Sequence, residues 1–291
     1  MSVLNVNAHP HDEGANTYMK LWRAAADQGA AAKFYGDKVA RIGSANSGVI
    51  GTGNAISGEI WTYTIVGGKG GVLKVKEKRI VDLSEVTLTT WEDLGFNPRT
   101  FHYTFLPDVH RVGFEWKGGM SPTFLRWTLQ TILNAPGVLS AAGVTHVDVQ
   151  LEQEESQLDQ ILALKLDELT VFLTKPNPDD LAGFPEEFRR NLAEQNAESQ
   201  TLKLKADPGS QLAPNRHTEA LARLALSNGH VQGHGRDMSS NKTKTLTTEE
   251  KPVRTGDLWD PSAESLLQLL SRQTAAIAAR IKARLRDDHD T

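Results

Sequence analysis

The sequence lacks cysteine altogether, and this absence removes several classes of chemistry. None of the 291 residues is a cysteine, so disulfide bonds, cysteine-ligated zinc, iron–sulfur clusters and thiol nucleophiles are excluded. No apolar run approaches the roughly 18 residues of a membrane-spanning helix, and no basic segment followed by an apolar one marks a signal peptide. Since a reducing compartment also disfavours disulfides, we expect a soluble, cytoplasmic protein with no membrane partner.

Motifs of the common nucleotide-binding and acyl-transfer enzymes are also missing. The stretches Gly51–Asn54 and Gly67–Gly71 are rich in glycine, but neither has the G-x-x-x-x-G-K-[ST] spelling of a phosphate-binding loop. No G-x-S-x-G nucleophile elbow occurs in the chain. We therefore expect no cofactor, and we favour a protein that is not catalytic.

Excess positive charge is absent as well. The formal net charge is −4, and residues 151–200 carry 4 Lys and Arg against 12 Asp and Glu, whereas residues 201–291 carry 14 against 11. An overall negative charge opposes nonspecific contact with phosphate backbones. A surface that binds nucleic acid must therefore be local, built of basic side chains that the fold gathers.

The order of the expected elements predicts an α+β protein in three parts. A mixed α/β domain is expected over residues 1–98, beginning with an alternating, half-exposed strand at Ser2–Asn7. Residues 99–207 repeat the order strand, helix, strand, as in a ferredoxin-like split βαβ unit. Residues 208–291 predict a helix, a β-hairpin and a long terminal helix. The glycine-rich stretch Gly43–Gly58 is predicted to be a loop.

Capping residues predict where two of the helices begin. Ser121 precedes a proline at the first position of a helix that we expect over residues 122–134. Asp260 precedes a proline in the same way, at the start of the terminal helix expected over residues 261–286.

The short segment richest in side chains that can ligate a metal or transfer a proton comprises His9, His11, Asp12 and Glu13. Two histidines at i and i+2 of an extended segment point to the same side, which suits metal ligation. A divalent metal needs further ligands, however, and no second cluster in the sequence supplies them. We therefore expect a structural turn without a metal, its carboxylates favouring the start of the next helix. The alternative is a nuclease in which these four residues are catalytic.

Two basic strips are candidates for contact with nucleic acid. The first follows a predicted hairpin and its exit, and comprises Lys69, Lys74, Lys76, Lys78 and Arg79. In a later hairpin, one face by period two carries His230, Gln232, His234 and Arg236, with Lys242 and Lys244 on the partner strand. A β-ribbon with basic and amide side chains on one face suits phosphate or groove contacts. We expect weak, nonspecific binding of duplex DNA; the alternative is an ordinary solvated surface.

The terminal helix carries an apolar seam made of Leu266, Leu270, Ile277 and Ile281. A seam of this length either pairs with a second copy of the chain or docks within its own chain. We expect a homodimer held by these four residues, although Thr274 interrupts the seam. The alternative is that the seam covers the helix predicted at Asn215–Ser227.

Several strings resemble an uncharacterised bacterial family, a domain of unknown function. They are L-N-V-N-A-H-P-H at Leu4–His11, Y-G-D-K at Tyr35–Lys38, R-I-G at Arg41–Gly43, N-P-D-D at Asn177–Asp180 and E-Q-N-A at Glu194–Ala197. The resemblance covers nearly the whole chain and implies no activity. The order of elements is also similar to that of the phage-exclusion DNA-binding protein RexA and the antiphage protein KwaB. That similarity implies a dimeric, non-enzymatic role in phage defence that involves nucleic acid.

These observations together predict a class of function rather than a reaction. We expect a nucleic-acid-binding or sensing component of a bacterial antiphage defence or toxin–antitoxin locus, with a protein partner encoded nearby. Two alternatives stay open: the nuclease described above, and a subunit that scaffolds or neutralises a protein partner.

Overall fold

The computed structural model describes residues 1–10, 13–50, 53–65, 72–74, 79–81, 95–118, 120–176, 184–256 and 259–287. His11 and Asp12 lie outside the described residues, as do Lys69, Lys76 and Lys78 of the first basic strip. The other two members of that strip lie in short paired strands: Lys74 is the last residue of β5 (Val72–Lys74), and Arg79 is the first residue of β6 (Arg79–Val81).

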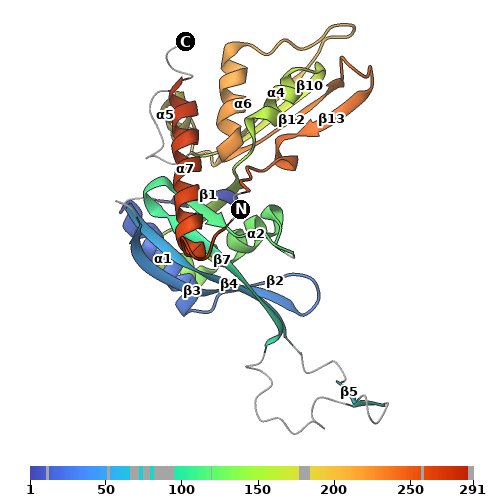
Figure 1. Ribbon diagram of the computed structural model, residues 1–291. Coiled ribbons are helices and arrows are strands. Elements are labelled where there is room, and N and C mark those ends of the chain that lie inside the picture. The colour runs from blue at the N-terminus through green and yellow to red at the C-terminus, as the bar shows by residue number, and fades with distance from the viewer. Residues whose placement is uncertain are drawn as a thin grey trace.

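Seven strands form an antiparallel sheet in the order β2-β3-β4-β7-β8-β1-β9 (Figure 1). Their bounds are β1 Ser2–His9, β2 Ala31–Lys33, β3 Lys38–Ile50, β4 Gly53–Ile65, β7 Gly95–Leu106, β8 Arg111–Phe114 and β9 His146–Leu151. The N-terminal strand thus lies between β8 and β9, so residues from three distant parts of the sequence meet in one sheet.

Three helices cover one face of this sheet and form the larger core. They are α1 (Ala15–Asp27), α2 (Pro122–Leu133) and α3 (Pro136–Ala142). The ring of Trp22 stacks on Tyr103 with centroids 5.0 Å apart, within an apolar cluster that includes the inward side chains of β1, β7, β8 and β9. Ser121 caps α2 by accepting a hydrogen bond from the Phe124 amide at 3.1 Å, which confirms the predicted start of that helix.

A second antiparallel sheet has four strands in the order β11-β10-β12-β13. Its strands are β10 Lys165–Thr174, β11 Ser199–Lys205, β12 Gly229–Arg236 and β13 Thr243–Thr247. The helices α4 (Glu155–Leu162), α5 (Phe184–Glu194) and α6 (Arg216–Asn228) pack on one face and enclose a separate apolar cluster. The predicted hairpin of β12 and β13 is confirmed.

The terminal helix α7 (Leu266–Asp287) packs against β7 and β8, on the face opposite to α1 (Figure 1). Ile277 and Ile281 contact Val3 and Val253 in a small apolar cluster, and Leu270 is also buried within the chain. These three residues are therefore covered by their own chain, so their assignment to a dimer interface is wrong. Leu266 remains half-exposed, and the homodimer itself stays a prediction.

The helix α7 also begins later than predicted. Asp260 closes a turn by accepting from the Ser262 amide at 2.9 Å, whereas the helix starts after Ser265. The Ser265 amide donates to the Gln268 side chain at 2.9 Å, and the Gln268 amide donates to Ser265 Oγ at 3.3 Å. This reciprocal pair is a capping box, and it satisfies two amides that a cap at Asp260 would leave open.

Buried polar side chains join the seven-stranded sheet to α6. Arg111 contacts Glu152 at 2.6 Å and donates to Asn5 at 2.7 Å, while Ser227 donates to Glu152 at 2.8 Å. Asn5 in turn donates to the carbonyl of Ser227 at 2.9 Å. All four side chains are almost fully buried. The strand expected to be half-exposed at Ser2–Asn7 is therefore buried on both faces, because α6 covers its polar side.

The α+β class is confirmed, but the predicted ferredoxin-like unit over residues 99–207 is wrong. Of its strands, β7, β8 and β9 belong to the seven-stranded sheet, whereas β10 and β11 belong to the four-stranded sheet. The register with β1 decides this, because β1 supplies the hydrogen-bonding partner of both β8 and β9. Alternation of strands and helices along the chain carries no information about which distant strand will pair.

The predicted loop at Gly43–Gly58 is also wrong, because β3 and β4 pair through most of it. Gly43 and Gly58 allow close approach of neighbouring atoms. A Cβ atom at Gly43 would lie 2.3 Å from the Trp61 ring, and one at Gly58 would lie 2.0 Å from the Ser44 carbonyl oxygen, beside a bulge.

Among the described residues, no helix has both the length and the apolar character needed to cross a membrane.

Candidate functional site

The four-stranded sheet leaves one face without a helical cover, and we call it the open face. The register places cross-strand partners on the same side of the sheet. The open face thus comprises Lys165, Glu168, Thr170 and Phe172 of β10, Thr201, Lys203 and Lys205 of β11, His230, Gln232, His234 and Arg236 of β12, and Thr243 and Thr245 of β13. Each of these residues is exposed or half-exposed, whereas the alternate residues of the central strands pack beneath the helices.

An aromatic pair lies on the two central strands of the open face. The rings of Phe172 and His230 are cross-strand partners, with centroids 5.2 Å apart and planes inclined by 30°. Both residues are half-exposed. Flat rings presented by the central strands of an open sheet are surfaces on which nucleobases stack.

Cations lie on the same face, toward the end of the sheet away from this pair. Lys165 lies opposite Arg236, and Lys205 lies opposite Glu168 in the register. Lys203 contacts Glu168 at 2.9 Å. The open face is therefore basic at the end where β10 begins, and such side chains attract phosphate groups.

The second predicted basic strip is only partly on this face. Arg236 lies on the open face as expected, and Lys242 is exposed in the turn that follows. Lys244, however, is the cross-strand partner of Gly235, so it points to the opposite side and pairs with Asp237. Lys244 therefore does not share a face with Arg236, because the register pairs Arg236 with Thr243.

The other end of the open face leads into a cleft between the two sheets. One cavity of about 420 Å³ is lined by Trp127 of α2, Asp148 and Gln150 of β9, and Phe172 of β10, among others. A second cavity of about 470 Å³ is lined by His9, His146 and Lys175 together with the end of α5. Glu198 lines both cavities, and therefore sits where they meet.

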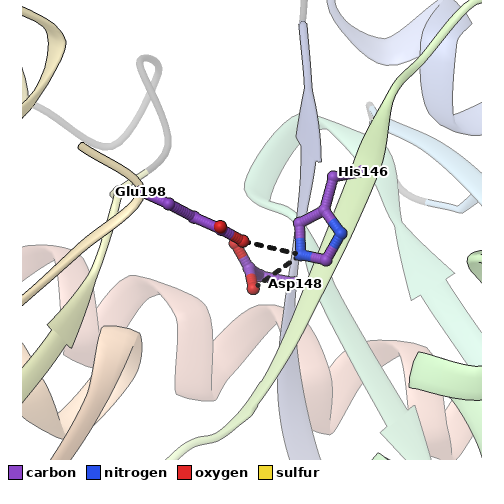
Figure 2. Close-up of side chains that lie close together, drawn as sticks. All are labelled: His146, Asp148 and Glu198. Carbon is purple, nitrogen blue, oxygen red and sulfur yellow. Dashed lines mark hydrogen bonds and ion pairs between the residues drawn. The ribbon is translucent and has the colours of Figure 1, made fainter. Parts of the chain in front are cut away.

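A cluster of imidazole and carboxylate groups occupies this junction (Figure 2). His146 and Asp148 project from β9, and Glu198 precedes β11 on the other sheet. His146 Nε2 lies 3.1 Å from Asp148 Oδ1 and 3.3 Å from Glu198 Oε1. One ligand atom from each residue lies within 4.8 Å of the others, which is close enough for all three to reach the same cation.

His9 joins this cluster from β1. It is the direct cross-strand partner of His146, and its Nε2 lies 3.4 Å from Asp148 Oδ2. Burial by itself raises the pKa of Asp148, but the imidazoles of His9 and His146 outweigh it and hold that pKa below the ordinary value. Asp148 is therefore an ionised carboxylate in the neutral range, although it is only 7% exposed.

The structural interpretation of the His9 turn assumed that no further metal ligands were available, and this assumption is wrong. Further ligand residues do lie beside His9, because antiparallel pairing brings β9 alongside β1. Glu13, the other described member of the nuclease alternative, points elsewhere and pairs with Lys20 at 2.7 Å. The cluster is therefore built from His9 with β9 and β11 residues, and not from the sequence string His9–Glu13.

Sequence reasoning missed His146, Asp148 and Glu198. A signal for the first two was present, since H-V-D-V alternates in a predicted strand and places His146 and Asp148 on one side. Nothing local marks Glu198, which reaches the site only because β11 pairs with β10 and the two sheets pack together.

The fold and the site define an α+β protein with an open, partly basic sheet face that ends at a cluster of histidines and carboxylates. The chain belongs to the DUF4747 family, a domain of unknown function, whose model matches residues 1–274. The resemblance to an uncharacterised family is thereby confirmed. No curated protein matches the sequence.

Proposed function

We propose that this chain binds single-stranded nucleic acid on the open face of its four-stranded sheet. The observation that carries the proposal is the half-exposed pair of Phe172 and His230 on the two central strands, with Lys165, Lys205 and Arg236 at the far end of the same face. Stacking of a base on an aromatic side chain is worth about 1–3 kcal/mol and tolerates any base. Lysine and arginine at the edge of the face add contacts to phosphate that carry no sequence information.

Single strands suit this surface better than the duplex DNA expected from the sequence. A β-ribbon that binds duplex DNA needs its cations on one face, but Lys244 and Arg236 lie on opposite faces. A duplex also keeps its bases stacked on one another, so their faces cannot reach Phe172. Binding of duplex with higher affinity than single strand would therefore contradict the proposal.

Fluorescence anisotropy with a labelled oligonucleotide of about 15 nucleotides, near the upper site size of compact single-strand binders, tests this directly. We expect Phe172→Ala to weaken binding about 5- to 150-fold, the equivalent of 1–3 kcal/mol. The matched control is Phe184→Ala, because Phe184 also contacts a histidine, His217, but lies on the helical side. Equal affinity in the two variants, or no binding by the unaltered protein at low salt, would refute the proposal.

The wider role that we propose is a cytoplasmic component of a bacterial antiphage defence or toxin–antitoxin locus. Its support is the similarity in layout to RexA and KwaB, together with the open face. The genes beside this one provide the test, since a nuclease, a membrane pore or a reverse transcriptase next to it would assign the role. A partner gene whose product binds the chain without any nucleic acid would instead favour the scaffold alternative.

A further inference from the structure

We infer that His146, Asp148 and Glu198 form a site for a divalent cation of the Zn²⁺ or Mn²⁺ type, with His9 as the residue that positions Asp148. Mixed imidazole and carboxylate donors are typical of such ions, whereas Mg²⁺ and Ca²⁺ prefer oxygen alone. At metal–ligand distances of about 2.0–2.2 Å, donors around a tetrahedral ion lie about 3.3–3.5 Å apart. The separations from His146 Nε2, 3.1 Å and 3.3 Å, are close to that spacing.

The burial of Asp148 is an independent reason to place a cation here. Asp148 Oδ2 and His9 Nε2 are both buried from solvent and neither makes a hydrogen bond, although they face each other at 3.4 Å. A buried carboxylate without full hydrogen bonding is costly unless a positive charge lies nearby. Among the described residues, the ion pairs of Asp148 and Glu198 involve only histidines. Lys175 and Arg126 line the same cavities, but neither forms an ion pair with these two carboxylates.

A second cluster in the same chain shows the contrasting arrangement. His102 lies 3.2 Å from Glu115 and 3.7 Å from Glu59, again one imidazole with two carboxylates. There Lys117 forms an ion pair with Glu115 at 2.9 Å, whereas the ion pairs of Asp148 and Glu198 involve only histidines. Glu115 is therefore a matched control for Glu198.

The position of His9 defines its role. It contacts the oxygen of Asp148 that does not face His146, and outer contacts of this kind hold a ligating carboxylate in orientation. Loss of such a contact typically weakens metal binding 10- to 100-fold. We thus expect His9→Ala to weaken binding without abolishing it, whereas loss of a ligand abolishes it.

Titration calorimetry of the chelator-treated chain with Zn²⁺ and with Mn²⁺ tests the site. We expect a single ion of at least one of the two metals per chain. Binding should be lost in Glu198→Gln, whose exposed side chain carries little risk to folding, and in the near-isosteric Asp148→Asn. Glu115→Gln should bind within about twofold of the unaltered chain. Absence of binding to the unaltered chain, or the same loss in Glu115→Gln as in Glu198→Gln, would show that the cluster is only a set of imidazole–carboxylate ion pairs.

The cavity shared with the open face gives the ion a natural further ligand, a phosphate oxygen of a bound strand; this step rests on the proposed function. A saturating concentration of whichever of the two metals binds in the calorimetry should then strengthen oligonucleotide binding by the unaltered chain and leave binding by Asp148→Asn unchanged. If metal binds but strand affinity does not change, the phosphate step is wrong and the metal site stands. If the strand binds and no metal does, the metal site is wrong and the proposed function stands.

Discussion

The strands β1 and β12 have similar alternating sequences, yet their polar faces meet opposite environments. In β1 the polar residues Asn5 and Asn7 are buried between the two sheets and hydrogen-bonded to β8 and α6 side chains or carbonyls. In β12 the polar residues Gln232 and His234 lie on the open face. Burial requires a partner for each polar group, whereas exposure leaves the group available to a ligand. The same pattern therefore makes a structural joint in one sheet and a candidate binding surface in the other.

The largest effect should come from breaking the buried ion pair of Arg111 and Glu152. Glu152→Ala leaves the Arg111 guanidinium buried without its carboxylate, and removal of one partner of a buried pair costs about 3–5 kcal/mol. We expect that loss in the free energy of unfolding measured with urea. Glu168→Ala, which removes the ion pair with Lys203 on the open face, should cost far less, because water screens an exposed ion pair. Similar losses of unfolding free energy in Glu152→Ala and Glu168→Ala would contradict the difference between the buried polar face of β1 and the open face.

The next largest effect concerns the helix that covers the seven-stranded sheet. Leu270 is 1% exposed and packs within its own chain, so Leu270→Ala should lower the free energy of unfolding by about 2–5 kcal/mol. The molecular mass in light scattering should stay the same as that of the unaltered chain. A drop from dimer to monomer without loss of stability would restore Leu270 to a dimer interface.

The smallest effect sharpens the comparison on the open sheet itself. Arg236 lies on the open face, and Lys244 lies on the opposite side, paired with Asp237. If Arg236 contacts a phosphate, Arg236→Ala should reduce the slope of log affinity against log salt by about 0.7 for a single strand. Lys244→Ala should leave the slope unchanged. Equal changes in both variants would indicate long-range attraction by net charge rather than contact on one face.

Local sequence was a good guide wherever a short segment decides its own structure. The start of α2 followed from Ser121 and its proline, because an N-cap needs only residues within one turn. The hairpin of β12 and β13 followed from its alternation and its polar turn. The start of α7 was missed, since Asp260 competes with the Ser265–Gln268 capping box a few residues later.

The seam of α7 shows where local reading fails. Thr274 interrupts the apolar pattern of the sequence, but its side chain is fully buried and donates a hydrogen bond to the Leu270 carbonyl at 2.6 Å. It fits beside β8 only because residue 113 is glycine, where a Cβ would lie 1.8 Å from Thr274 Oγ1. Two residues that are 161 positions apart in the sequence thus fit together, and neither indicates the other in the sequence.

The sequence by itself determined the α+β class, the family, the β12–β13 hairpin, the start of α2, and which side chains of a strand share a face, because all of these depend on neighbours along the chain or on period. Only the tertiary structure decided which strands pair, which faces are covered, and that His9, His146, Asp148 and Glu198 meet. The physical reason is that strand pairing and sheet packing satisfy hydrogen bonds and bury apolar area between distant segments. No local pattern records which distant segment supplies the partner.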